Sequence, residues 1–385
     1  MRILHLLALA ARMHWASPRD VSMAVAGFAL ASSVLTLLLA IPSGLEKAAA
    51  STGRPDVALA LSAGAFDEAT STLSAQHLQP LGSLPAVARD EHGAPLIAPH
   101  LIGRTTITVN GRNRPIQVRG VDPMTWKVME LEGERLARLV TGSRGLLIGS
   151  WAVTPPSSHP VRVRAGQWHV AGRADHDGSL WDSEYWADLS TLQADYQSPS
   201  QFSVALIRLN AAADLPALRE AVREDPRLSG IRIVRQSDYY QLHTQWLAEL
   251  IRSVSLVIAA TLGAAAALTI GNALSTSFLG RRRYAATVRA MGFSSRTLAL
   301  AAWMEVQIIG ALTCCAVLLL VRVTLDGHTF AAASEGHQVL AQLDVGVGAA
   351  AVSLVYTLLL AMAASVVPIW TLSFGILVDA LGADR

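Results

Sequence analysis

Five arginines stand close together between two long apolar stretches of the chain, and they are Arg281, Arg282, Arg283, Arg289 and Arg296. Residues 253–280 before them carry no charged side chain, and residues 297–321 after them carry only Glu305. Guanidinium groups bind carboxylates and phosphates, and a basic connector between two bilayer-length segments indicates the cytoplasmic side of a membrane. We therefore expect a docking element for a soluble partner, although positive charge that only orients the spans is the simpler alternative.

Sequence motifs for catalysis are absent. A nucleotide-binding P-loop needs glycine-rich backbone and a lysine, and neither Lys47 nor Lys127 stands in a G-x-x-x-x-G-K-[ST] context. The zinc-protease motif H-E-x-x-H and the nucleophile elbow G-x-S-x-G do not occur either. His159, His169 and His176 are irregularly spaced among Pro and Gly, so we expect solvated loop residues and no metal site. The chain is thus expected to be a non-catalytic subunit.

Four uncharged windows are long enough to cross a membrane, for which about 20 residues are needed. They cover residues 21–41, 253–280, 297–321 and 345–378. We expect the fourth span to end before Pro368, because proline tends to end a helix. The 52% hydrophobic and 16% charged content of the 385 residues agrees with a membrane protein.

The distribution of charge predicts the orientation. Arg2, Arg12 and Arg19 precede the first span, whereas residues 323–344 contain no Lys or Arg. Both termini are therefore expected in the cytoplasm, and the first span is expected to be an uncleaved anchor. The expected order is a cytoplasmic segment (1–20), transmembrane helix 1 (21–41), an outer domain with a stalk (42–245), transmembrane helix 2 (246–280), the connector (281–296), transmembrane helix 3 (297–322), an outer loop (323–344), transmembrane helix 4 (345–367) and a cytoplasmic tail (368–385).

The segment between the first two spans has the patterning of a mixed α+β domain. Strands are expected at residues 57–61, 105–109, 115–119, 145–149, 167–170, 202–209 and 231–234. Leu215–Glu224 reads as an amphipathic helix that ends before Pro226. From Ser237 to Gly280 no proline interrupts a helical pattern, which predicts a stalk continuous with the second span; a break near Trp246 is the alternative. The two cysteines, Cys314 and Cys315, lie in the third span and cannot cross-link this domain.

The connector and two outer segments carry a family resemblance. The residues of the connector that we expect to dock are Arg281, Arg282, Arg283, Tyr284, Arg289, Met291, Gly292, Phe293 and Arg296. The connector resembles the R-x-R-E-I-G-T-L-R-A-L-G-F pattern of FtsX-like, MacB-type permease subunits of ABC transporters (type VII fold). Glu305 corresponds to a glutamate of that family's third span. The turn Gly120, Val121, Asp122, Pro123 looks like the family's G-V-D-P, and Trp186 and Asp188 lie in a stretch like its S-E-x-W-A-D-L.

The resemblance implies a function and partners. In this family the connector is a coupling helix that docks on a separate ATPase, which binds ATP and Mg, and the stalks transmit motion to outer domains (mechanotransmission). It implies a bacterial inner-membrane permease that exports a peptide, lipopeptide, antibiotic or similar amphiphile, with a periplasmic adaptor and an outer-membrane channel. The alternatives are an FtsX-like signal relay that activates a periplasmic enzyme, and lipoprotein extraction of the LolC/LolE kind. No nucleic-acid partner is expected, since the outer domain is nearly neutral.

The chain departs from the family pattern at two places. Tyr284 replaces the coupling-helix glutamate, and Thr371 and Leu372 stand where basic residues are usual. We expect one half of a heterodimeric permease, with a homodimer as the alternative. Glu305 near the inner membrane edge is expected to pair with a connector arginine, because an unpaired charge in lipid costs a few kcal/mol. The G-V-D-P turn and Trp186 are expected chiefly to form the fold.

Overall fold

The computed structural model describes residues 18–109, 111–131, 141–155, 160–280, 282–334 and 337–382. Arg2, Arg12, His159 and Arg281 lie outside these ranges. The chain divides into two compact units. The helical unit holds residues up to Ser43, Ala248–Gly327 and the residues from Leu343 on, and the sheet domain holds Gly44–Leu247 and His328–Gln342.

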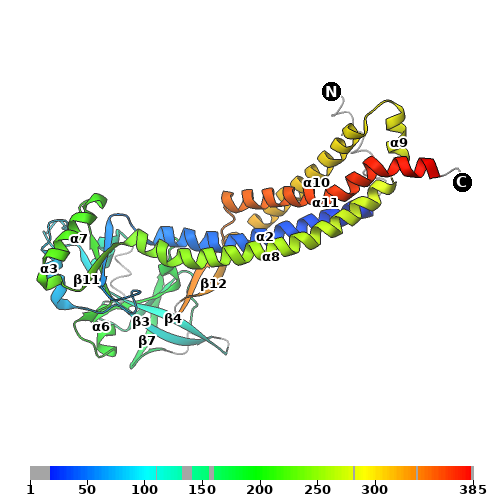
Figure 1. Cartoon of the computed structure of the whole chain (residues 1–385). Coiled ribbons are helices and arrows are strands. Elements are labelled where there is room, and N and C mark those ends of the chain that lie inside the picture. Colours follow the sequence, from blue (N-terminus) through cyan, green and yellow to red (C-terminus); the bar gives the residue numbers. More distant parts are fainter. Residues whose placement is uncertain are drawn as a thin grey trace. The chain divides into compact units, whose positions relative to one another are not determined.

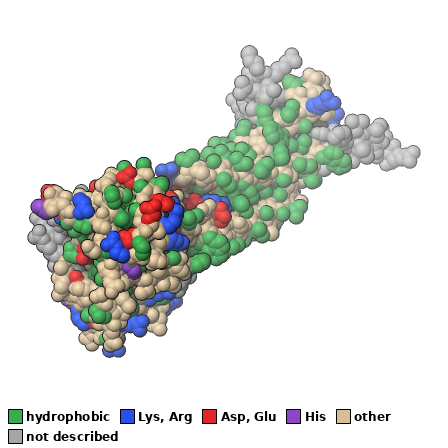
Figure 2. Space-filling model, turned by 60° about the vertical axis from the view of Figure 1, so that its left-hand side comes forward, with side chains coloured by type: hydrophobic (Ala, Val, Ile, Leu, Met, Phe, Trp, Pro, Cys, Tyr) green, Lys and Arg blue, Asp and Glu red, His purple; other side chains and the backbone are tan. Residues whose placement is uncertain are grey.

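Within the described ranges, four long apolar helices build the helical unit and confirm the predicted number of spans (Figure 1). They are α2 (Pro18–Thr52), α8 (Gln236–Gly280), α10 (Ser295–Leu325) and α11 (Val347–Gly382). Helix α8 has 45 residues without interruption, so there is no break near Trp246, and at 1.5 Å per residue it is about 68 Å long. Its large exposed side chains in the membrane-spanning part are apolar, including Val257 and Leu268, as expected for lipid contact (Figure 2).

Small residues allow close packing of the four helices. An ideal Cβ on Gly27 of α2 would lie 2.7 Å from Ile270 of α8, and one on Gly310 of α10 would lie 3.4 Å from Ala361 of α11. Phe28 fills the space between these helices and is fully buried. Helices in lipid gain little from the hydrophobic effect, so close van der Waals contact of this kind stabilises their association.

Two of the long helices contain a proline that does not end them. Helix α11 continues past Pro368 to Gly382 and α2 continues past Pro42 to Thr52, whereas the expected end of the fourth membrane span before Pro368 stays a prediction. Proline lacks an N–H and so leaves the carbonyl four residues earlier without its helical donor. Neighbouring helices in a membrane can compensate for this loss. Here α8 approaches both carbonyls: the Ser255 hydroxyl lies 3.3 Å from that of Leu38, and an ideal Cβ on Gly271 would lie 3.2 Å from that of Ala364.

The sheet domain is built around a mixed sheet, which confirms the predicted α+β class. Among the described residues nine strands follow the order β11-β1-β10-β3-β4-β8-β5-β7-β6. Their bounds are β1 Val57–Ser62, β3 Ile97–Val109, β4 Arg112–Val121, β5 Gly145–Gly149, β6 Val161–Val163, β7 Gly166–Ala174, β8 Tyr185–Asp188, β10 Val204–Arg208 and β11 Ile231–Arg235. Two further pairs are β2 (Leu73–Ser74) with β9 (Gln201–Phe202), and β12 (Thr329–Ser334) with β13 (His337–Gln342).

Both faces of the sheet are covered by helices (Figure 1). Strand β1 shows the alternation: Ala58 and Ala60 pack with α7 (Leu215–Glu224), whereas Leu59 and Leu61 pack with the first turns of α8. Since side chains of a strand alternate between faces, a strand buried on both sides is apolar throughout, as Val57–Leu61 is. Among the described residues, further short helices of the sheet domain are α3 (Leu78–Gly82), α4 (Met124–Met129) and α6 (Leu189–Asp195).

Each predicted strand is present, but several have other limits. The strand expected at 105–109 begins already at Ile97, and the run 202–209 is divided between β9 and β10. Strand β8 and the hairpin β12–β13, within the segment expected to be an outer loop, are additions that the sequence pattern did not indicate. Strand β8 has only four residues, too few for periodicity to reveal it.

Candidate functional sites

The arginine-rich connector forms a short helix, α9, at Arg282–Ala290, between α8 and α10. Its Ala285 and Val288 are buried at 3% and 1% exposure, while Ala286, Thr287 and Ala290 are exposed. Positions three residues apart lie on the same side of a helix, so α9 has one packed side and one open side. Arg282, Arg283 and Tyr284 are placed by their backbone alone, since the described side chains begin at Ala285.

Gly292 ends α9, as predicted. Its φ of +95° is in the left-handed region, which glycine adopts without steric cost. The Gly292 N–H donates to the Arg289 carbonyl at 2.9 Å, and the Phe293 N–H donates to the Val288 carbonyl at 3.4 Å. This pair of bonds is a Schellman motif, which satisfies the last carbonyls of a helix. Ser294 then caps α10 by accepting from the Thr297 N–H at 3.2 Å.

The turn after α9 presents the remaining predicted docking residues. Met291 is 63% exposed and Arg296 is exposed, whereas Arg289 and Phe293 are half-buried. An exposed methionine beside an arginine is a surface that a partner can cover, because methionine adapts its shape and arginine binds carboxylates. Glu305 lies half-buried on α10 and takes part in an interaction, so it is no isolated charge; its pairing with a connector arginine stays a prediction.

The structure brings together the two outer motifs that the sequence separates by more than 60 residues. Strands β4 and β8 are parallel neighbours, with Gly120 opposite Ala187 and Val121 opposite Asp188. An ideal Cβ on Gly120 would lie 2.9 Å from the Leu192 side chain and 3.3 Å from the Leu189 Cα. Glycine is therefore needed for α6 to pack closely on the sheet.

Both aspartates of these motifs start a helix. Asp122 accepts from the Met124 N–H at 2.7 Å, and Pro123 directly precedes α4. Burial raises the pKa of Asp122, and the charge of Asp188 raises it further. Asp188 caps α6 by accepting from the Thr191 N–H at 2.9 Å. Although burial opposes ionisation, hydrogen bonds from Ser190 and Thr191 lower the pKa of Asp188.

Trp186 of the second motif lies at the centre of an aromatic cluster and is fully buried. Its ring centroid is 5.7 Å from that of Trp126, 5.4 Å from that of Trp181 and 4.2 Å from that of His176. His176 is 7% exposed and lies 3.3 Å from the Asp182 carboxylate. The prediction that His176 is a solvated loop residue is therefore wrong, because tertiary packing buries it; His169 is exposed, on strand β7.

A buried charge network lies next to these motifs. The fully buried Arg119 donates from Nε to Glu184 Oε2 at 2.6 Å and from Nη2 to Glu68 Oε2 at 2.8 Å. Gln117 donates to Glu184 at 2.7 Å, and the Tyr240 hydroxyl of α8 donates to Glu68 at 2.8 Å. Buried charges require such partners, because removal from water costs several kcal/mol per ion.

The network also controls the protonation of its members. Burial raises the pKa of Glu184, against the opposing effect of Arg119. Burial raises the pKa of Tyr240 well above its ordinary value, and Glu68 adds to this effect. His100 lies 3.3 Å from Arg119 and 2.9 Å from Thr125, and burial together with Arg119 lowers its pKa well below the ordinary value. His100 is therefore neutral at pH 7.

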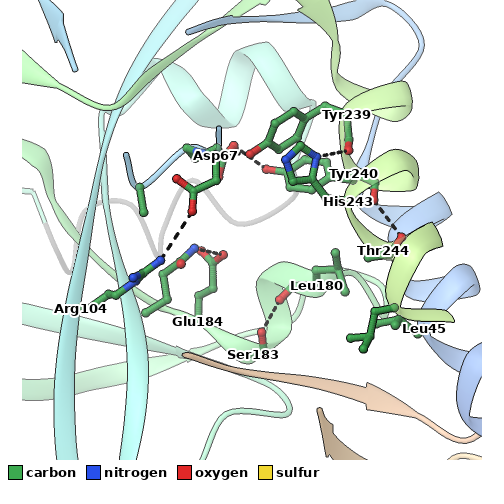
Figure 3. Close-up of a pocket in the computed structure, with 14 residues that line it drawn as sticks. Leu45, Asp67, Arg104, Leu180, Ser183, Glu184, Tyr239, Tyr240, His243 and Thr244 are labelled. Atoms are coloured by element: carbon green, nitrogen blue, oxygen red, sulfur yellow. Dashed lines mark hydrogen bonds and ion pairs between the residues drawn. The ribbon is translucent and has the colours of Figure 1, made fainter. Parts of the chain in front are cut away.

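A pocket opens beside this network, with about 720 Å³ of empty space that is partly open to solvent (Figure 3). Its walls come from the loop after β1, strands β3 and β4, the segment before β8, and helices α2 and α8. The lining residues are Leu45, Asp67, Glu68, Ala69, Arg104, Gln117, Leu180, Ser183, Glu184, Tyr239, Tyr240, His243, Thr244 and Leu247. Most of the exposed wall is apolar, so the carboxylates and Arg104 are the few groups that can orient a ligand.

Sequence reasoning did not select the residues of this pocket. Glu184 lies within the S-E-x-W-A-D-L stretch and Arg119 directly precedes Gly120, but neither position by itself indicates a role. Single charged residues beside a motif are a weak signal, and only the pairing of β4 with β8 places Arg119 next to Glu184. Within the described ranges no group of three or more His, Cys, Asp or Glu side chains could hold a metal ion.

Comparison with known proteins gives the following matches. No family model matches the chain, and no curated protein matches it. The periplasmic region of MacB from Actinobacillus actinomycetemcomitans is similar over 50% of this chain and 94% of its own, with 12% identity and a TM-score of 0.35. The extracellular domain of the noncanonic ABC-type transporter YknZ from Gram-positive bacteria is similar over 46% of this chain and 100% of its own, with 12% identity and a TM-score of 0.34.

Proposed function

We propose that this chain is a non-catalytic permease subunit of an ABC transporter and couples ATP hydrolysis by a separate ATPase to movement of its sheet domain. The observation that carries the proposal is α9: a short helix between two membrane spans, with a packed apolar side and a glycine-ended turn that exposes Met291 and Arg296. A helix that is held on one side and open on the other can transmit a push from a bound partner to the spans on either side of it.

Helix α8 supplies the path for this coupling. It runs without a break from Gln236 to Gly280, directly before the connector. Tyr239, Tyr240 and His243 in its first turns line the pocket of the sheet domain. A continuous helix resists bending because each residue adds a backbone hydrogen bond, so displacement at one end is transmitted along it.

The complete complex is proposed as an exporter in a bacterial inner membrane, with both termini in the cytoplasm and the sheet domain outside. Its cargo would be a peptide, lipopeptide, antibiotic or similar amphiphile, and a periplasmic adaptor and outer-membrane channel would complete the path. ATP and Mg would be bound by the ATPase alone. A second, different permease chain would form the other half of the membrane part, which the unusual residues of the connector favour.

Affinity purification from native membranes, followed by mass spectrometry, tests this proposal. We expect an ATPase, a second permease and an adaptor to be recovered with the tagged chain. Substituting both Met291→Glu and Arg296→Glu should lower ATPase recovery about tenfold, since the exposed surface would lose its shape and reverse its charge. Arg322→Glu, a charge reversal at the opposite end of α10, is the matched control and should leave recovery unchanged.

Other results would lead to other conclusions. An ATPase with a cell-wall hydrolase and no adaptor would favour the signal relay, and a lipoprotein carrier would favour lipoprotein extraction. Recovery of one permease species with a functional ATPase would contradict the heterodimer. If no ATPase were recovered under any condition, the docking role of α9 would be wrong.

A further inference from the structure

The pocket of the sheet domain has three carboxyl groups, those of Asp67, Glu68 and Glu184, against the two guanidinium groups of Arg104 and Arg119. One guanidinium, that of Arg119, is shared between the carboxylates of Glu68 and Glu184, so this triad of fully or nearly buried groups carries one net negative charge when both glutamates are ionised. The third acidic group, Asp67, lies 3.7 Å from Arg104 and forms a balanced pair with it (Figure 3). A charge held away from water attracts a counter-charge more strongly than a solvated one does.

Apolar side chains are exposed next to the same pocket. Phe66 directly precedes Asp67 and is 84% exposed, and its carbonyl lies 3.1 Å from His243 Nε2. On α8, Leu242 and Trp246 are 66% and 71% exposed; being four residues apart, they share the side of the helix adjacent to His243. Phe66, Leu242 and Trp246 are each adjacent in sequence to a pocket-lining residue, and together they offer exposed apolar surface to the apolar part of a ligand.

We propose that this pocket binds a cationic amphiphile, whose ammonium or guanidinium group lies near Glu68 and Glu184 and whose apolar part lies on Phe66, Leu242 and Trp246. The aromatic rings of Tyr239 and Tyr240 are part of the wall, and cations are attracted to the faces of such rings. An anionic head group would meet the excess negative charge instead, and a neutral one would gain nothing from it. The charge of the triad therefore supplies selectivity, and the apolar side chains supply most of the contact.

The role of the bound molecule as cargo or signal rests on the proposed function, whereas its binding is a property of this chain alone. Helix α8 contributes one wall of the pocket and part of the exposed apolar surface. A bound amphiphile would therefore contact the helix that leads to the connector. Binding in the pocket would in this way shift α8 and, through the connector, affect the bound ATPase.

The test uses the purified full-length chain in lipid nanodiscs, without any ATPase, and isothermal titration calorimetry. The probes share one chain length: octylammonium, octanoate and octanol. We expect octylammonium to bind at least about tenfold more tightly than the other two. Glu184→Gln leaves the Arg119 guanidinium with one carboxylate, so it should abolish the preference for octylammonium and leave octanol binding unchanged. The matched control is Glu224→Gln, which replaces an exposed glutamate on α7. This control should change the binding of none of the three probes.

A second variant keeps the test decisive if Glu184→Gln disturbs the fold. Trp246 is exposed, so Trp246→Ala should leave the fold intact and weaken all three octyl probes several-fold, with ethylammonium unaffected. Equal binding of octylammonium and octanoate would overturn the proposal, as would a preference that survives Glu184→Gln in a folded protein. Charge-selective binding without a recovered ATPase would refute only the proposed function, and a recovered ATPase without charge-selective binding would refute only this inference.

Discussion

The Ser255 hydroxyl on α8 lies 3.3 Å from the Leu38 carbonyl on α2, the carbonyl that Pro42 deprives of its helical donor. The same hydroxyl lies 2.6 Å from the Ile251 carbonyl of its own helix, so its proton is shared between the two acceptors. An apolar surrounding offers no water to satisfy the freed carbonyl. Ser255 therefore gives the freed carbonyl a donor, which makes Pro42 compatible with a continuous α2.

Removing this hydroxyl should weaken the helical unit. We expect Ser255→Ala to lower the free energy of unfolding by about 0.6 kcal/mol, the usual value for a hydrogen bond between membrane helices. In a Pro42→Ala background, where the Leu38 carbonyl regains its helical donor, the same substitution should have almost no effect. Unfolding in mixed micelles with increasing denaturing detergent measures both values. Ser33→Ala is the control, since the half-buried Ser33 donates to the Leu30 carbonyl of its own helix. Equal losses for Ser255→Ala in the two backgrounds would contradict the explanation.

The second proline-freed carbonyl should make Gly271 intolerant of a side chain. Pro368 leaves the Ala364 carbonyl without its helical donor, and an ideal Cβ on Gly271 of α8 would lie 3.2 Å from that oxygen. We expect Gly271→Ala to destabilise the unit by about 1 kcal/mol and Gly271→Val by about 1–3 kcal/mol, because the helices must separate. Gly348→Ala on α11, where a Cβ meets nothing within 4 Å, is the control. A tolerated valine at position 271 would show that α8 and α11 are not held together here.

Asp188 should stabilise α6 as an ionised cap. We expect Asp188→Ala to cost about 1 kcal/mol, seen as faster hydrogen exchange in Leu189–Asp195, and Asp188→Ser to retain most of the protection. The pKa of Asp188 is lowered in the folded protein, so the stabilisation from its charge is present above the unfolded value of about 4 and is lost as the pH falls through the folded value. The difference between Asp188→Ala and the unsubstituted chain should accordingly shrink below about pH 4.

His100 should make the sheet domain sensitive to mild acid. Arg119 can only donate, so His100 Nδ1 accepts and its Nε2–H donates to Thr125; protonation of Nδ1 would break this arrangement beside a buried guanidinium. Because the folded pKa is depressed, stability falls as the pH drops below the unfolded value of about 6.5, by up to about 1.4 kcal/mol per pH unit.

Urea unfolding, followed by the near-ultraviolet circular dichroism of the buried tryptophans, measures this effect between pH 7.5 and 5. His100→Gln should be less stable at pH 7.5 but lose less stability on acidification than the unsubstituted chain. His169→Gln removes an exposed histidine and should retain the full pH dependence. Identical slopes for His100→Gln and the unsubstituted chain would show that another group carries the acid sensitivity.

Local signals made the spans, the connector and much of the sheet domain predictable. These signals are hydropathy in the uncharged windows, charge in the arginines and backbone conformation at Gly292. Helix α7 and strand β5 begin and end at the residues that their patterns predict. The docking role of Arg289, Met291 and Phe293 remains a prediction, since their backbone positions alone do not reveal what binds them.

The buried charge network and the aromatic cluster depend on residues far apart in the chain. The pairing of β4 with β8 joins Arg119 to Glu184, and α8 then adds Tyr240 to the same network. Packing likewise buries His176 against Trp186. In sequence these are isolated polar residues, because burial and charge neutralisation are properties of a three-dimensional neighbourhood. The helices that continue through Pro42 and Pro368 show the same dependence. The carbonyls that these prolines leave without a donor lie next to Ser255 and Gly271 of α8, which are far from them in the sequence.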